Sequence, residues 1–187
     1  SIPLEDILRG GTGFYGGGPA NVGDLLNLVT FEPTSMASLQ IGDVRLSCGG
    51  PEFCGIQQIA VSPLVIFDDA VSNTWDRGIV GYDTVVNGDY TESQGNHISW
   101  EIVDTGEEGH DSVIRTTFSD SGASGVTFIG SSAGVDFGPW SDGELAFDVR
   151  IVSNPNGYAM VYKLDGAAQA SSTGDRSLGV LPEGEWQ

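Results

Sequence analysis

The chain has 187 residues, 28 of them glycine, and its 26 acidic residues against 7 basic ones give a formal net charge of −19. The length suits one domain with a full hydrophobic core, and so much glycine disfavours long helices while it suits turns between short strands. The charge excludes nucleic acid and anionic membrane surfaces as partners, because both would be repelled, and no apolar run approaches the roughly 20 residues that span a bilayer.

The first third of the chain combines one short helical pattern with two strand candidates. Pro3–Leu8 is the only stretch that looks helical. Leu26–Phe31 fits either a strand or a turn of helix, whereas Leu39–Leu46 is a strand candidate. We therefore expect mostly strand structure in this region.

Two cysteines follow, Cys48 and Cys54, separated by Gly-Gly-Pro-Glu-Phe. The Gly-Gly-Pro core can turn sharply and bring the two sulfurs together, which predicts a disulfide in a secreted protein. Two free thiols are the alternative. A zinc site is disfavoured, because the only histidines that could add to the cysteines are His97 and His110.

Alternating strands dominate the rest of the chain. The clearest is Glu144–Val152, where apolar residues lie on one face and charged residues lie on the other. Tyr158–Leu164 alternates in the same way, and Ser153–Gly157 between them predicts a hairpin loop. Further strand candidates are Pro63–Phe67, Ile98–Val103, Ser112–Phe118 and Val126–Gly130. Short strands joined by turn-rich links predict an all-β protein, a single antiparallel β-sandwich of jelly-roll type over residues 1–187.

The sequence offers little for catalysis. It has no Gly-x-Ser-x-Gly motif, and neither cysteine has a motif partner. His110 lies in the acidic stretch 107–111 and could act as a base, but no nucleophile is placed beside it. Among 26 acidic residues, some pair will reach the spacing of a glycosidase by chance. We therefore assign no catalytic residue and expect a domain that is not an enzyme.

Aromatic residues in polar, turn-rich surroundings are the candidates for a binding site. Sugar rings stack their apolar C–H faces on flat aromatic side chains, while neighbouring polar groups bond the hydroxyls. Trp100 alternates with Ile98 and Ile102, so we assign it to the core. The other candidates lie in loops, which carry a large share of binding residues. The expected platform consists of Trp75, Tyr82, Tyr90 and Trp140, with Asp76, Arg77 and Asp83 binding the hydroxyls.

Five segments of the chain, taken in their order, carry a resemblance to a known family. They are Val65–Val71, Trp75-Asp76, Ile98–Asp104, Leu145–Arg150 and the Gly-Glu-Trp that ends at Trp186. In this order they resemble the accessory domains of marine bacterial β-glucan hydrolases. As a whole, residues 61–187 look like the extra C-terminal domain of ExoP-type exo-1,3/1,4-β-glucanases, which belong to glycoside hydrolase family 3.

The resemblance implies a galactose-binding-like β-sandwich that is similar to carbohydrate-binding modules. It implies a parent glycoside hydrolase of the exo-glucanase or β-glucosidase type, with β-glucan and the catalytic domain as partners. It also implies one structural Ca²⁺ at the sheet edge, held here by Asp43, Asp68 and Asp69. A purely structural, interdomain or oligomerisation module without a sugar site is the alternative.

The order of the segments departs from the family. There, a Gly-Glu-Trp-Gln segment runs on into a Val-Ser-Ile-Pro-Leu-like strand and then a last strand like Ile41–Leu46, whereas here these pieces open the chain. Residues 1–58 would then supply the family's C-terminal strands and 61–187 its N-terminal portion, as in a circular permutation. This predicts that Trp186-Gln187 lie beside Ser1–Leu4. Because the chain starts at a serine, without a signal peptide, we expect it to be a segment of a secreted or periplasmic protein.

Overall fold

The structure, a computed structural model, consists almost entirely of β-strands in the residues that it describes. These residues are 2–3, 6, 25–31, 37–47, 62–83, 91–92, 98–118, 125–166 and 173–187, and for 25–31, 80–83, 91–92 and 125–128 only the backbone is described. The strands are β1 (Ile2–Pro3), β2 (Leu25–Phe31), β3 (Ala37–Ser47), β4 (Leu64–Asp68), β5 (Ala70–Val71), β6 (Gly78–Asp83), β7 (Thr91–Glu92), β8 (Ile98–Glu107), β9 (His110–Phe118), β10 (Gly125–Val135), β11 (Glu144–Ser153), β12 (Met160–Gly166) and β13 (Arg176–Gly179), with one 3-10 turn, η1 (Gly138–Trp140).

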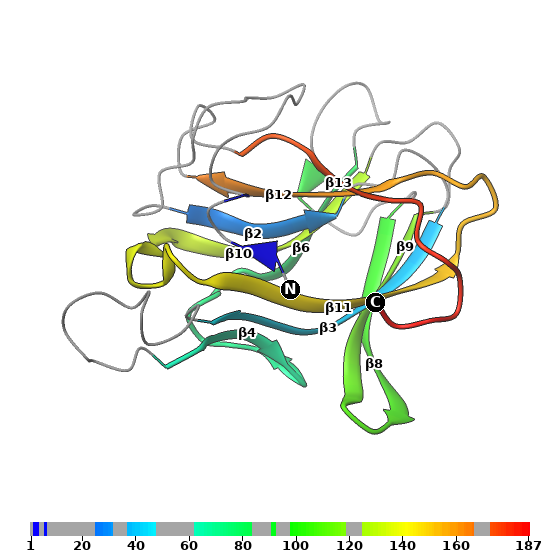
Figure 1. The fold of residues 1–187 in the computed structure, drawn as a ribbon, viewed down its shortest axis with the longest axis horizontal. Coiled ribbons are helices and arrows are strands. Elements are labelled where there is room, and N and C mark those ends of the chain that lie inside the picture. The colour runs from blue at the N-terminus through cyan, green and yellow to red at the C-terminus, as the bar shows by residue number, and fades with distance from the viewer. Residues whose placement is uncertain are drawn as a thin grey trace.

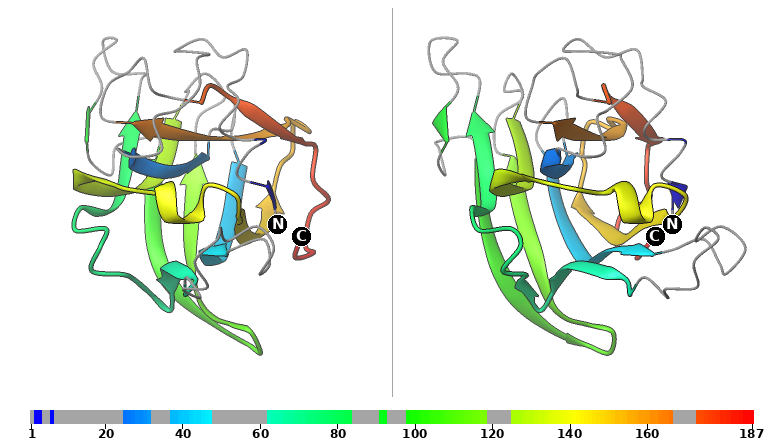
Figure 2. Two further views of the ribbon diagram at one scale, coloured as in Figure 1. Left: turned by 60° about the vertical axis from the view of Figure 1, so that its left-hand side comes forward. Right: turned by 90° about the vertical axis from the view of Figure 1, so that its left-hand side faces the viewer.

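The strands form two antiparallel sheets that lie over one another as two layers (Figures 1 and 2). One sheet has the order β1-β11-β3-β4-β5, and the β8–β9 hairpin joins it because β9 pairs with β3. The other sheet has the order β13-β12-β2-β10-β6-β7. The predicted all-β fold with antiparallel sheets is therefore confirmed.

Most of the predicted strands are present, several of them longer than expected. Glu144–Val152 corresponds to β11 within one residue, and the ambiguous segment Leu26–Phe31 is a strand, β2. The predicted strand Tyr158–Leu164 lies two residues further along the chain: β12 begins at Met160, so Tyr158 precedes the strand and is exposed. The helical pattern at Pro3–Leu8 falls mostly outside the described residues.

Strand β3 organises the first sheet, because it has three partners. One edge pairs with β11 along most of its length. The other edge is divided: residues 37–41 pair with β9, and residues 44–46 pair with β4. Between these two stretches lies Asp43, whose φ of +48° is unusual for a residue other than glycine. The sheet therefore splits beside Asp43, and the β8–β9 hairpin separates from β3 there.

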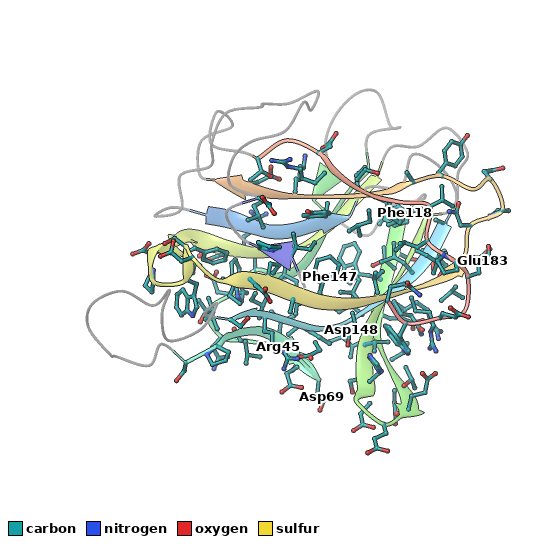
Figure 3. The ribbon with its side chains drawn as sticks, viewed as in Figure 1. Arg45, Asp69, Phe118, Phe147, Asp148 and Glu183 are labelled. Carbon is teal, nitrogen blue, oxygen red and sulfur yellow. The ribbon has the colours of Figure 1, made fainter. Side chains whose placement is uncertain are left out.

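The hydrophobic core lies between the two layers and receives side chains from both. Leu145, Val149 and Ile151 of β11 are at most 2% exposed, which confirms the predicted alternation. Phe147 of the first sheet and Tyr162 of the second pack with their ring centroids 6.2 Å apart, and Figure 3 shows Phe147 between the layers. Burial of each such large apolar side chain contributes about 1.5–3 kcal/mol.

Strand β8 begins in the core and then leaves it. Ile98 is buried, and Trp100 packs partly buried against the core, as its periodicity predicted. Two residues further on, Ile102 is 47% exposed. Figures 1 and 2 show the cause: the β8–β9 hairpin is a long curved arm that projects beyond the rest of the sheet.

The two ends of the chain lie along the same edge of β11, opposite the edge that β3 occupies (Figure 1). Ile2 pairs with Leu145, while Trp186 bridges Arg150. The Gln187 amide donates to the Val149 carbonyl at 3.0 Å, and the Val149 amide donates back at 3.3 Å. The two terminal segments are thus halves of one interrupted edge strand, which confirms the predicted proximity of the termini.

Joining the two ends should give a closed chain that folds and is more stable than the linear chain. The register along β11 leaves room for a linker of about two residues between Gln187 and Ser1. Closing the ring removes entropy from the unfolded chain, for which the loop-closure relation gives at most about 5 kcal/mol at this length. Urea unfolding of the closed chain, compared with the linear chain carrying the same added residues, measures the gain. A closed chain that unfolds at lower urea would contradict the placement of the termini.

Candidate functional site

The tip of the β8–β9 hairpin is held in a defined shape by its own side chains. Asp104 accepts a hydrogen bond from the amide of Gly106 at 2.9 Å. The Thr105 hydroxyl accepts from the Glu107 amide at 3.0 Å and donates to the His110 carbonyl at 2.5 Å. Gly106 has a positive φ of +66°, a conformation that suits glycine in such a turn. The tip therefore presents the Glu107 and His110 side chains in fixed positions.

Both of these side chains reach the outer face of the first sheet, the face turned away from the core. There they meet residues from β3, β11 and the C-terminal segment in a group that we call the outer-face cluster. Its members come from positions as far apart as 40 and 186, so the fold alone brings them together. The cluster consists of Gln40, Glu107, His110, Asp148, Arg150 and Trp186.

Arg150 occupies the centre of the outer-face cluster. Its Nη1 donates to both carboxylate oxygens of Glu107, at 2.7 and 2.9 Å. Its Nε and Nη2 donate to the Oε1 atom of Gln40, at 2.8 and 2.5 Å. The guanidinium carbon also lies 4.6 Å from the ring centroid of Trp186, within the range of a cation–π interaction. These contacts satisfy a guanidinium whose side chain is only 17% exposed.

His110 is equally enclosed. Its ring stacks on the indole of Trp186, with centroids 3.9 Å apart and an interplanar angle of 4°. Its Nε2 atom lies 3.0 Å from Oδ2 of Asp148. Gly42 lies beneath the ring, and a Cβ atom there would be 3.3 Å from Cδ2 of His110. A side chain at position 42 would therefore press on the His110 ring and require it to shift by a few tenths of an ångström.

The environment of Glu107 favours its charged form. The indole Nε1 of Trp186 donates to Oε2 of Glu107 at 2.9 Å, and this hydrogen bond is the main reason why the pKa of the carboxyl lies below its ordinary value. The hydrogen bonds and positive charge of Arg150 lower the pKa further. The cluster thus joins a carboxylate, a guanidinium and two stacked rings, and it fastens the hairpin and the C-terminal segment to β11.

The sequence indicated His110 as a possible base but did not predict this cluster. Glu107 and Trp186 are 79 residues apart, so no local pattern could connect them. The one usable signal was the run Gly-Glu-Trp at the end of the chain, which we assigned to a strand without a partner for its tryptophan.

Trp75 does not offer a ring to a ligand. It is 1% exposed and packs edge-on against Phe137, with centroids 5.9 Å apart and an interplanar angle of 82°. The prediction that it belongs to an open platform is wrong, because the turn after β5 directs the side chain into the core. In that turn the Trp75 amide donates to the Ser72 carbonyl at 2.9 Å. Burial of its large apolar surface outweighs the polar neighbours that suggested exposure.

The residues beside Trp75 hold neighbouring strands together. Asp76 accepts hydrogen bonds from the Ser132 hydroxyl and from the Ser132 amide, the latter at 2.7 Å, and these bonds lower the pKa of its carboxyl. The backbone amide of Arg77 donates to the Gly130 carbonyl at 3.1 Å.

Trp140 is partly buried against the core, and its indole Nε1 donates to the Ser62 carbonyl at 3.0 Å.

The rest of the predicted platform is only partly described. Tyr82 and Asp83 lie in β6, opposite Glu92 and Thr91 of β7, and their side chains are outside the described part. Tyr90 also lies outside it, as do Cys48 and Cys54, so the predicted disulfide stays a prediction. The described residues of the platform are therefore not assembled into one open surface.

The carboxylates predicted to bind calcium lie near the place where the sheet splits. Val44 pairs with Phe67, which puts Asp43 and Asp68 at neighbouring positions. Oδ2 of Asp43 already pairs with Nη2 of Arg45 at 2.8 Å, and Oδ1 of Asp69 accepts from the Ser112 amide at 3.1 Å. Figure 3 labels Arg45 and Asp69. Over the described ranges, no three His, Cys, Asp or Glu residues are grouped so that they could hold a metal ion. The three aspartates thus fit a calcium site poorly as they stand.

The link between β11 and β12 is not the hairpin loop that the sequence predicted at Ser153–Gly157, because the two strands lie in different sheets. A closed loop that the sequence did not show lies at the end of β11 instead. The side chain of Asn154 donates from Nδ2 to the Tyr158 carbonyl at 2.8 Å, and its Oδ1 accepts from the Tyr158 amide at 3.1 Å. The Asn154 carbonyl accepts from the Gly157 amide at 3.0 Å, and the Asn154 amide donates to Oε1 of Glu183 at 2.6 Å. This closed loop carries Tyr158, whose side chain projects with 41% of its surface exposed.

No protein-family model, curated protein or solved structure matches the chain. Within the described residues, no helix has the length and hydrophobicity to cross a membrane.

The charge of Glu107 should make the stability of the protein depend on pH in the acid range. Its folded pKa is depressed below 4.5, so its stabilising contribution is present above pH 4.5 and is lost as the pH falls through the lowered folded pKa. Glu107→Gln keeps an acceptor for Trp186 but removes the charge that faces Arg150. We expect the variant to be less stable than wild type at neutral pH, with a difference that shrinks below pH 4.5. Urea titrations from neutral pH to pH 3 measure this, and a difference that stays constant would contradict it.

Calcium binding can be tested directly on the melting temperature. If a Ca²⁺ ion joins Asp43, Asp68 and Asp69, the ion stabilises the folded state by mass action, because the unfolded chain has no assembled site. Millimolar Ca²⁺ should then raise the melting temperature of wild type above its value in chelator, and should not do so in Asp68→Asn. Equal melting temperatures of wild type in both solutions would show that calcium does not stabilise this fold.

Proposed function

We propose that this chain is a non-catalytic accessory domain of a secreted glycoside hydrolase and that it binds β-glucan. The observation that carries the non-catalytic part is the outer-face cluster. His110 is the one histidine in the described part of the chain, and it is bonded to Asp148 and stacked on Trp186. A general base must reach the proton that it removes. The groups that could do acid–base chemistry here instead fasten a hairpin and a terminal segment.

Three features support the binding part of the proposal. The ordered segments that resemble accessory domains of β-glucan hydrolases include Leu145–Arg150, the strand that both terminal segments join. The two-layer all-β architecture is of the kind on which loops at the ends of a sandwich carry ligand sites. A tethered binding domain would raise the effective concentration of the catalytic domain at its substrate. The finer assignment to a galactose-binding-like jelly roll belongs to the same proposal.

A structural role is the second candidate, and one observation favours it. Two of the rings expected to stack on sugar are covered at least in part: Trp75 is buried, and Trp140 packs partly buried against the core with its indole nitrogen bonded to Ser62. A domain of this kind could instead hold the catalytic domain in place or join copies of the enzyme. The two roles differ in whether the isolated domain binds polysaccharide at all.

Binding of polysaccharide by the isolated domain decides between these roles. We expect the domain to be retarded in gels containing β-1,3-glucan or mixed-linkage β-glucan, and not in gels containing an α-linked glucan. Calorimetry with the matching oligosaccharides should give weak binding, with Kd on the order of 0.1–1 mM, because a small open site gains few contacts against the entropy lost on association. Absence of retardation, together with absence of heat at millimolar oligosaccharide, would leave the structural role in place of the binding role.

A further inference from the structure

Tyr158 is the most exposed aromatic side chain in the described part of the chain. It is 41% exposed, whereas Trp75 is buried and Trp100 and Trp140 pack partly buried against the core. Trp186 has His110 stacked on its ring and the Arg150 guanidinium over it. Covering an exposed aromatic ring with a second flat, apolar surface costs little free energy. Tyr158 is therefore the natural place for a ligand that stacks on a ring.

The loop that carries Tyr158 is organised before any ligand arrives. Asn154 is only 8% exposed, and its side chain bonds both the amide and the carbonyl of Tyr158. Its own amide is bonded to Glu183, which ties the loop to the segment that follows β13. The backbone that carries the ring is held in this way, so it loses little conformational freedom on binding, and preorganisation of this kind favours affinity.

The surroundings of the loop combine apolar and hydrogen-bonding surface. Val152 at the end of β11 and Val180 just after β13 are 45% and 62% exposed. The segments that follow β11 and β13 both cross between the layers at this end (Figure 1). Glu183 is exposed at the same end of β11 (Figure 3). A carboxylate has about four acceptor positions, so its bond to Asn154 leaves capacity for sugar hydroxyls.

We propose that Tyr158 is the stacking residue of a shallow carbohydrate subsite, with Glu183 accepting hydrogen bonds from sugar hydroxyls. The ligand class is a neutral glycan. An anionic polysaccharide with uronate or sulfate groups would be repelled by a protein of net charge −19 and by Glu183 itself. This inference rests on the proposed binding function, because it names the place where that binding occurs.

Calorimetry of three Tyr158 variants with a β-glucan oligosaccharide tests the subsite. Tyr158→Ala should weaken binding about tenfold, because the stacking surface is lost. Tyr158→Phe and Tyr158→Trp should stay within about threefold of wild type, since each keeps a flat ring. Ile102→Ala is the matched control: its side chain is similarly exposed but lies on the β8–β9 hairpin, and it should bind as wild type does. An oligosaccharide of uronic acids should give no binding to any variant.

The outcomes separate the subsite from the function. If wild type binds glucan and Tyr158→Ala binds equally well, the subsite is wrong and the binding function stands. If wild type binds no glucan, both are wrong. If Tyr158→Ala melts well below wild type, its loss of binding could come from unfolding. The subsite is then tested with Tyr158→Phe and with Glu183→Gln, which keeps the acceptor for Asn154. Wild-type affinity in Glu183→Gln, or a large loss in Tyr158→Phe, would then contradict stacking beside a carboxylate.

Discussion

The divided edge of β3 is the constraint on which the rest of the structure depends. A strand edge can be paired by only one partner at each residue, and β3 is shared between β9 at residues 37–41 and β4 at residues 44–46. The change of partner takes place at Asp43, in a positive-φ conformation. Beyond this point β9 can no longer be held by backbone hydrogen bonds to β3, so the far half of the β8–β9 hairpin must find other partners. It finds them by crossing the outer face of the sheet, where Gly42 leaves room for the ring of His110.

The outer-face cluster is the consequence of that crossing. A chain with so few basic residues places one of them, Arg150, at a point where the hairpin, β3 and the C-terminal segment converge. A guanidinium that is mostly withdrawn from water is tolerated only when its donors are satisfied, and here Glu107 and Gln40 satisfy them. The carboxylate of Glu107 serves both Arg150 and the indole of Trp186. Removing Arg150 would take a hydrogen-bond partner from both Glu107 and Gln40, so the group acts as a joint fastening of two segments that backbone pairing alone would hold weakly.

The fold could be predicted from the sequence more fully than the site. The strand pattern depends on residues that are close together in the sequence, whereas the site depends on residues that are far apart in it. The period of two that places Leu145, Val149 and Ile151 in the core is a local property, and so is the assignment of Trp100 to the core side. Whether a ring outside a regular strand is covered depends on distant residues. Trp75 is covered by Phe137, whereas Tyr158, which continues the alternation of β12 in the sequence, lies two residues before the strand and is exposed. The outer-face cluster could not be predicted for the same reason, since its members lie on four strands and a terminal segment.

The C-terminal segment links the outer-face cluster to the loop that carries Tyr158. Over five residues it contacts β11 repeatedly: Glu183 bridges Ile151, the Gly184 amide donates to the Ile151 carbonyl at 2.8 Å, and Trp186 bridges Arg150. Glu183 bonds the loop at one end of this segment, and Trp186 enters the cluster at the other. The outer-face cluster fastens the C-terminal segment, and this segment positions Glu183. The geometry around Tyr158 therefore depends on contacts at the tip of the β8–β9 hairpin, which is far away in the sequence. The cluster therefore contributes to the proposed site around Tyr158 by holding one of its two sides in place.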